Sequence, residues 1–395
     1  MKLVVVAALV TVIAILGSRL SFTRLRLPLG LENFFLTGTE YVLVGLLLGS
    51  AALDLLDAST LQSLHPFMGL GLSWIGMLFG VQWEFKRLRR IPPPTFAVAL
   101  LQAVVTMIAV ALPFYLLFRR LFAYETDIVL ICAISLAAAA SDTGQSGLAL
   151  VTRGKEIAKK PLVPLLQNVS NLDGLVGVIA FGLVSCLAQL HDGTPAYQWI
   201  GISVGLGLTV GLLMAALTAY RLKEEEMLLV VIGSIAFGGG LALYLNLSPL
   251  LVNLIAGAVV ANLARSRGQA GIRSVLLRGE RSIYVLFLIL VGAAWQLGSL
   301  WIFLLAFLYL VSRIAGKLLG GGLASRLFLP PSLAAGGIGL GLLSHGGMAL
   351  AIVVNLHQIH RSALTDVVIS IILLGMLVSE LIGPTLLRRT LEQNR

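Results

Sequence analysis

The stretch "AAAASDTGQSGLAL" (residues 137–150) interrupts a long apolar run with a carboxylate, Asp142, followed by polar residues and glycines. A charged side chain at the centre of a bilayer costs about 2.5–3.5 kcal/mol on insertion scales. Backbone that leaves the helix at that depth is tolerated only where it is buried in protein or lines a watery cavity. The stretch therefore predicts a transmembrane helix that is broken near Asp142, with the carboxylate facing the protein interior.

The whole chain has the composition of a polytopic membrane protein. Of its 395 residues 58% are hydrophobic and 12% are charged, and the mean hydropathy is +0.97. We expect an all-α protein with about 13 transmembrane helices, because each apolar run has roughly the 17–25 residues that cross a bilayer. The predicted runs are 3–20, 38–54, 66–83, 95–118, 127–151, 162–190, 196–219, 227–245, 248–264, 282–297, 299–323, 333–357 and 364–387.

The net charge of +10 reflects membrane topology. Most of the 28 lysines and arginines fall in alternate connections between the runs, and such a bias marks the cytoplasmic side. The sequence thus predicts an integral protein of a bacterial inner membrane, with its N-terminus outside and its C-terminus in the cytoplasm. The expected partner is the lipid bilayer and not a nucleic acid. We expect no soluble regulatory domain, since the longest connection is about 265–281.

The order of the runs suggests an internal repeat. Transporters are often built from inverted repeats with broken helices at corresponding positions. We predict one transporter domain, 1–395, with a first six-helix repeat in 1–190, a linker helix in 191–226 and a second repeat in 227–395. The fifth run then corresponds to the twelfth, in which "GLLSHGGMALAIVVN" (341–355) forms a second glycine-rich break with Ser344 and His345. We expect the two breaks to cross, although glycines also serve close helix packing alone.

Asp173 is the strongest candidate for an ion site. It lies in "LLQNVSNLDGLVGVIAFGLV" (165–184), about a third of the way into the sixth run, near Asn168 and Asn171. Carboxylate and amide oxygens suit a hard cation, and a carboxylate also binds a proton. A group that holds either ion is the minimum that an exchanger requires.

Other ionisable residues also fall within apolar runs. Arg313 and Lys317 are four residues apart and share a helix face, where they either brace the broken helices or take part in transport. His345 either titrates or is a satisfied interior histidine. We expect Glu380 near the cytoplasmic end, within reach of Arg388 or the neighbouring arginine.

Five stretches together resemble the cation:proton antiporter superfamily, the sodium/proton exchanger fold. They are "LQSLHPFMGLGLSWIGMLFGVQWEFKRLRR" (61–90), "AAAASDTGQSGLAL", "NLDGLVGVIAF" (171–181), "SRIAGKLLGG" (312–321) and "GLLSHGGMALAIV" (341–353). The resemblance implies a homodimer in which an ion-carrying core domain moves against a dimerisation domain, in an elevator-like motion. The resemblance also assigns roles to residues of this chain. It makes Asp173 the essential ion and proton carrier. Ser141, Asp142 and Thr143 would supply the oxygens of the unwound helix, and Lys317 or Arg313 would be the basic residue of the second repeat.

The chain departs from the family pattern beside the essential carboxylate. The family has Asn-Asp or Asp-Asp there, and this sequence has Leu172-Asp173 or Asp173-Gly174, depending on the register. Asp142 is a candidate for the missing second carboxylate, and Asn171 or Asn168 for the missing amide. One titrating carboxylate implies electroneutral 1:1 exchange, whereas two acids release two protons per cation.

The sequence therefore favours a secondary antiporter that exchanges a monovalent cation, Na⁺ ahead of K⁺ or Li⁺, for protons at Asp173 and Asp142. The main alternative is a sodium-coupled organic-anion symporter resembling the bile-acid transporters, and a channel is less favoured. No nucleophile motif, metal cluster or phosphate loop is found. We therefore expect neither an enzyme nor a bound cofactor.

Overall fold

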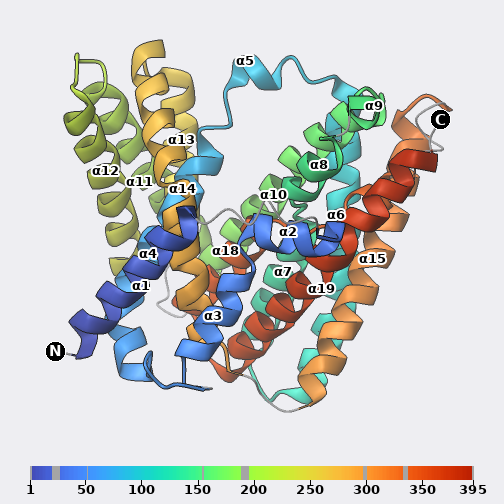
Figure 1. Ribbon diagram of the computed structural model, residues 1–395, viewed down its shortest axis with the longest axis horizontal. Helices are drawn as coiled ribbons and strands as arrows, with labels where there is room; N and C mark the ends of the chain where they lie inside the picture. Colours follow the sequence, from blue (N-terminus) through green and yellow to red (C-terminus); the bar gives the residue numbers. More distant parts are fainter. Residues whose placement is uncertain are drawn as a thin grey trace. The chain divides into compact units, whose positions relative to one another are not determined.

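The computed structural model describes residues 2–19, 27–50, 52–153, 155–187, 195–296, 300–331 and 337–393. These residues form helices and no named strand (Figure 1). The chain divides into two compact units, each made of three separate segments of the sequence. Unit 1 comprises Met1–Ser21, Glu40–Arg90 and Ser185–Gln296, and unit 2 comprises Phe22–Thr39, Ile91–Val184 and Leu297–Arg395.

Unit 1 contains eight of the named helices. They are α1 (Lys2–Arg19), α3 (Glu40–Leu48), α4 (Ala58–Gly80), α5 (Phe85–Leu88), α11 (Ala196–Leu217), α12 (Glu224–Tyr244), α13 (Pro249–Leu263) and α14 (Ser266–Ala294). Polar caps begin two of them: Asp57 accepts from the N–H of Thr60 at α4, and Ser248 accepts from that of Leu251 at α13. α4 and α13 pack side by side (Figure 1), and their close approach depends on Gly80, where an added Cβ would lie 2.2 Å from the carbonyl oxygen of Leu254.

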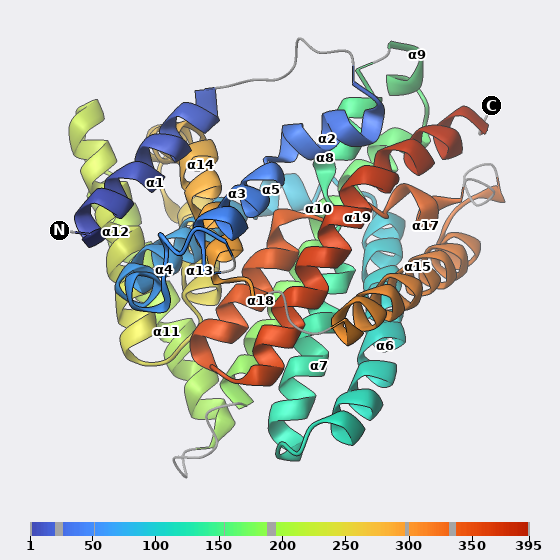
Figure 2. The ribbon, with the colours of Figure 1, turned by 60° about the horizontal axis from the view of Figure 1, so that its bottom comes forward.

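Unit 2 contains the interrupted helices. Its helices are α2 (Leu29–Thr37), α6 (Pro93–Leu121), α7 (Thr126–Ser141), α8 (Gln145–Val151), α9 (Lys155–Ala158), most of α10 (Leu162–Leu187), α15 (Trp301–Phe328), α17 (Ile338–Gly341), α18 (Gly347–Ile359) and α19 (Ala363–Gln393). α6 packs along α15 on one side and α7 on the other (Figure 2). The interior is strongly apolar, yet it holds a group of fully buried charged side chains.

The predicted all-helical membrane fold is confirmed, and each of the 13 predicted runs overlaps a helix or a pair of helices. Within the described residues, seven helices are long and apolar enough to cross a membrane, or eight if α2 and α3 form one interrupted span. Several of the other helices are shorter or more polar, so the number of crossings stays a prediction.

The range 265–281, predicted as a connection, is helical from Ser266 onward, where α14 begins. Its first half is amphipathic: Ile272, Val275 and Leu276 are buried, while Arg273 is exposed. Because such a helix is apolar on one face only, its mean hydropathy is low. A prediction from apolar runs therefore places the start of the helix too late in the sequence.

The range predicted as a linker helix, 191–226, contains α11, which belongs to unit 1. Residues 191–194 of this range lie outside the described part of the chain. The division into two repeats stays a prediction.

Candidate functional site

Two helices of unit 2 are interrupted, and the interruptions meet. Residues 142–144 separate α7 from α8, and residues 342–346 separate α17 from α18. The N–H of Gly144 donates to the carbonyl oxygen of Ser344 at 3.0 Å, and α7 packs against α18 (Figure 2). The predicted crossing of the two breaks is therefore present, and it brings backbone polar groups into the interior of the unit.

Two glycines make this crossing possible. A Cβ added to Gly144 would lie 2.1 Å from the carbonyl oxygen of His345, and one added to Gly346 would lie 2.2 Å from a carboxylate oxygen of Asp142. Real Cβ atoms do not approach other atoms so closely, and only glycine lets a backbone come this near. The glycines of both breaks thus serve the contact between them.

Asp173 of α10 is fully buried beside the break in α7. Its Oδ2 accepts hydrogen bonds from Nε2 of Gln102 at 2.9 Å, from Oγ1 of Thr143 at 2.5 Å and from Nζ of Lys317 at 3.0 Å. Its Oδ1 accepts from the backbone N–H of Thr143 at 3.2 Å. This carboxylate therefore has partners on α6, on α15 and in the break between α7 and α8.

Lys317 of α15 is also fully buried, and its ammonium group has three acceptors. Nζ donates to the carbonyl oxygen of Ser141 at 2.6 Å, to Oγ1 of Thr143 at 2.8 Å and to Oδ2 of Asp173 at 3.0 Å. An ammonium group has three protons to donate, so each has an acceptor. The charge of Lys317 is compensated by the ion pair with Asp173, and removing either partner of a buried pair typically costs about 3–5 kcal/mol.

Arg313, one turn earlier on α15, hydrogen-bonds to both broken helices. Nε donates to the carbonyl of Ala140 at 3.0 Å, and the terminal nitrogens donate to those of Leu343 at 2.6 Å, Asp142 at 2.9 Å and Ser344 at 3.2 Å. These carbonyls lie at or just beyond the C-terminal ends of α7 and α17, where helix carbonyls lack intrahelical partners and carry partial negative charge. The guanidinium group thus satisfies two helix ends at once.

The side chain of Asp142 contacts the N-terminal end of a helix, α18, whereas Arg313 binds C-terminal ends. Its Oδ2 accepts from the backbone N–H of Ala349 at 2.9 Å, in the first turn of α18. The residue at the N-cap of α18 is Gly346, which has no side chain to cap the helix. Asp142 therefore does for α18 what an N-cap aspartate does within one chain segment, and its negative charge is favoured there.

The model of the sodium/hydrogen exchanger transmembrane family matches residues 8–393 of the chain. The protein belongs to the sodium/hydrogen exchanger family. Its fold is similar to that of the sodium proton antiporter MjNhaP1 from Methanocaldococcus jannaschii, with a TM-score of 0.70 over 100% of this chain and 99% of that one, at 16% identity. No curated protein matches the sequence significantly. The family and this structural neighbour are transporters and not enzymes.

In this exchanger, some predicted site residues lie away from Asp173. Asn171 is exposed; its Oδ1 accepts from Gln145, and its Nδ2 donates to the carbonyl of Gln167 at 2.8 Å. It therefore does not supply the missing amide. Ser141, in contrast, contacts the site: its carbonyl oxygen accepts from Lys317, and its hydroxyl hydrogen-bonds to the carbonyls of Ala138 at 2.7 Å and Asp173 at 3.4 Å.

The second break contributes backbone groups more than side chains. Ser344 accepts through its carbonyl, and His345 is buried with Nε2 2.8 Å from the hydroxyl of Tyr309. Glu380 does not pair with Arg388, contrary to the expectation from sequence. It is fully buried and accepts from Nδ2 of Asn33, while Arg388 pairs with the carboxylate one turn further along α19.

Gln102 was not predicted as a site residue. It lies on α6, is fully buried and donates to Asp173. Its Oε1 is buried without a hydrogen-bond partner among the described residues. The sequence does contain a feature that could have identified it: Gln102 is the one amide side chain in the apolar run 95–118.

Proposed function

We propose that this exchanger carries Na⁺ across the membrane in exchange for H⁺, with Asp173 as the carboxylate that binds the cation. K⁺ and Li⁺ are further candidates for the same site. The match to the exchanger family over almost the whole chain and the antiporter fold support this proposal. Within the chain, it is supported by the position of a buried carboxylate beside crossed helix breaks.

The main support for this proposal is the set of oxygen atoms that surrounds the ammonium group of Lys317. Nζ is bonded to the carbonyl of Ser141, the hydroxyl of Thr143 and the carboxylate of Asp173. These are the oxygen types that bind hard cations. A dehydrated Na⁺ at this place would meet the same three oxygens, so the cation and the ammonium compete for one position.

Gln102 provides a fourth oxygen. Its Oε1 has no hydrogen-bond partner among the described residues, although its Nε2 is bonded to Asp173. The oxygen and nitrogen ends of the amide have nearly the same size, so the side-chain amide can rotate by half a turn and exchange their positions. The unpartnered oxygen is then offered to a cation at the carboxylate.

This competition couples the two ions. When a cation takes the oxygens of Ser141, Thr143 and Asp173, the ammonium of Lys317 loses its acceptors. An unpaired ammonium group in an apolar interior is costly, so its proton leaves as the cation arrives. The cycle is completed when a proton binds to Lys317 again, restores its ion pair with Asp173 and so releases the cation. One charge enters the site for each charge that leaves it, and the expected exchange is 1:1.

We propose that Asp142 caps α18 and is not a second proton carrier. Its hydrogen bond from Ala349 and the N-terminal end of α18 both stabilise the charged form. Among the described residues, no hydrogen bond joins Asp142 to Asp173. The hypothesis that it is a second proton carrier stays a prediction.

The residues of the proposed site all belong to unit 2. An elevator-type mechanism requires that the cation be held by one body that moves as a whole, and a site confined to one unit meets this requirement. We therefore propose that unit 2 is the carrier. We further propose a homodimer.

Reconstituted vesicles with an internal pH-sensitive dye test the exchange. Addition of Na⁺, K⁺ or Li⁺ outside should change the internal pH for the wild type, and Asp173→Asn should abolish the change. Asp127→Asn is the matched control: it also neutralises one aspartate, but an exposed one in the first turn of α7, and it should transport normally.

Two results contradict the proposal. Normal exchange by Asp173→Asn would exclude this carboxylate as the cation site. Sodium-dependent uptake of a labelled organic anion, without any cation-driven pH change, would favour the symporter instead.

A further inference from the structure

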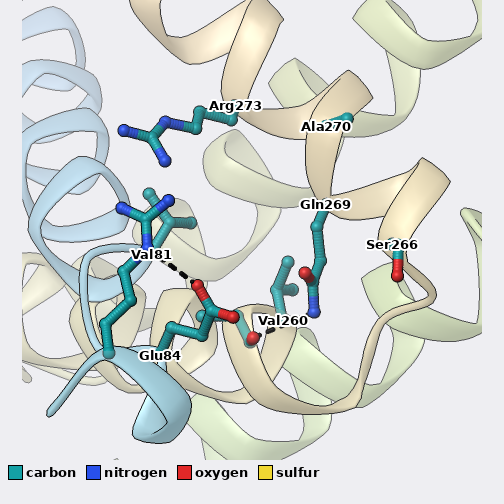
Figure 3. A pocket seen from close by; sticks show the side chains of 9 residues that line it. Val81, Glu84, Val260, Ser266, Gln269, Ala270 and Arg273 are labelled. Atoms are coloured by element: carbon teal, nitrogen blue, oxygen red, sulfur yellow. Dashed lines mark hydrogen bonds and ion pairs between the residues drawn. The ribbon is translucent and has the colours of Figure 1, made fainter. Parts of the chain in front are cut away.

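A pocket of about 250 Å³ lies within unit 1 (Figure 3), whereas the residues of the proposed exchange site belong to unit 2. It is formed where α4 leads into α5 and where α13 leads into α14. Its lining residues are Val81, Glu84, Arg87, Val260, Ala261, Ser266, Gln269, Ala270 and Arg273. The positive-inside pattern predicts that this end of the helices is cytoplasmic.

Two side-chain amides hold the walls of the pocket together. Asn262 donates to the carbonyl of Trp83 at 2.7 Å and accepts from the N–H of Phe85 at 2.8 Å. Gln269 donates to the carbonyl of Ala261 at 2.9 Å. The segment after α4 and the start of α14 are thus both tied to the end of α13, so the pocket is a built feature of the unit.

The charges in the pocket are mainly positive. Glu84 is paired with Arg87 at 2.9 Å, the ion pair drawn in Figure 3. Arg273 comes from α14 (Figure 3) and has no ion pair within the part of the chain that the structure describes. Ser266 begins α14, whose N-cap residue Arg265 makes no capping hydrogen bond. The first N–H groups of this long helix add partial positive charge at the wall formed by Ser266.

We propose that this pocket binds a phosphate group. Guanidinium groups present paired N–H donors that match two phosphate oxygens, and Arg87 and Arg273 supply two of them from separate helices. The start of α14 supplies backbone donors of the kind that bind anions. Glu84 holds Arg87 in place by their ion pair and leaves Arg273 available to the ligand.

The phosphate has two possible sources, a lipid headgroup or a soluble phosphate. Phe85, Leu263 and Leu277, near the pocket in sequence, are 56%, 63% and 53% exposed, and such apolar side chains offer contacts to acyl chains. A free phosphate needs only the charged lining. Both sources share the chemistry that the two arginines recognise.

Thermal stabilisation of the detergent-purified full chain tests the pocket. The probes are inorganic phosphate at constant ionic strength, dioctanoyl phosphatidylglycerol and dioctanoyl phosphatidylcholine. The choline lipid controls for the acyl chains, because its ammonium group neutralises the phosphate. We expect the first or second probe to raise the melting temperature in a saturable way, and the third to have a much weaker effect.

Arg273→Gln should weaken the apparent affinity for the effective probe about tenfold, the loss expected for one charge-assisted pair of hydrogen bonds. Arg278→Gln is the matched control. It removes the same charge from the same helix, at an exposed position outside the pocket that pairs with Glu224, and should change the affinity by less than about twofold.

Stabilisation by inorganic phosphate supports a soluble source, and stabilisation by phosphatidylglycerol alone supports a lipid. The proposal is overturned if neither probe acts, if the choline lipid acts equally, or if both arginine variants lose affinity to the same extent. The pocket shares no residue with the proposed exchange site, so these outcomes are independent of the transport assay.

Discussion

Replacing Arg313 by lysine keeps the positive charge but removes the planar fork that joins the two broken helices. The guanidinium group makes four hydrogen bonds, to carbonyls of Ala140, Asp142, Leu343 and Ser344. A lysine ammonium lies near the place of the guanidinium carbon, about 1.3 Å short of the terminal nitrogens. It can shift toward one helix end or the other, and we expect it to keep two of the four bonds.

The expected cost follows from the lost bonds. A hydrogen bond from a charged donor contributes roughly 1.5–3 kcal/mol, so two of them are worth about 3–6 kcal/mol. Relaxation of the helix ends recovers part of this, and we expect a loss of about 3 kcal/mol. With an unfolding entropy of about 2.1 cal/mol/K per residue, a chain of 395 residues loses about 4 °C in melting temperature.

Thermal unfolding of the detergent-purified protein, followed by tryptophan fluorescence at one fixed heating rate, measures this shift. Arg326→Lys is the matched control, because Arg326 lies on the same helix and is exposed. It should melt within about 1 °C of the wild type, as surface substitutions usually do. Arg313→Gln, which also loses the charge, should melt lower than Arg313→Lys. If Arg313→Lys melts with the Arg326→Lys control, Arg313 does not brace the crossed helices.

Two further substitutions test the residues around the carboxylate. Asp142→Asn keeps an acceptor for the N–H of Ala349 and removes only the charge, so exchange should continue and, being 1:1, should be insensitive to membrane potential in both the wild type and the variant. A response to membrane potential that is present in the wild type and lost in Asp142→Asn would make Asp142 the second proton carrier. Gln102→Leu keeps the side-chain bulk but removes one hydrogen bond to Asp173 and the unpartnered oxygen. The cation KM should rise about tenfold, the equivalent of one bond of about 1.4 kcal/mol, with a smaller change in kcat. An unchanged KM in the vesicle assay would exclude Gln102 as a cation ligand.

Predictions from the sequence succeeded where a local property decided the structure. The apolar runs locate the helices, because crossing a bilayer demands a long apolar segment. They fail for the first half of α14, where apolar residues lie on one face only. Both helix breaks were found because glycines and polar residues stand within apolar runs.

The partners within the site were harder to predict. Asn171 is near Asp173 in sequence, but it is exposed and bonded elsewhere. The amide beside the carboxylate is that of Gln102, which is 71 residues away. On a helix, two residues of separation place side chains on different faces, so nearness along the chain is a poor guide here.

The sequence by itself therefore determined that this is a helical membrane protein with two broken helices and a carboxylate at membrane depth. The cost of placing charge and open backbone in lipid makes those features visible in one dimension. Only the tertiary structure decided which charge meets which partner. Lys317 bonds to the carboxylate of Asp173 from 144 residues away, and Asp142 bonds to α18 across 207 residues. Such pairings depend on how the helices pack and on the direction of each side chain, and neither is encoded in the pattern of a single segment.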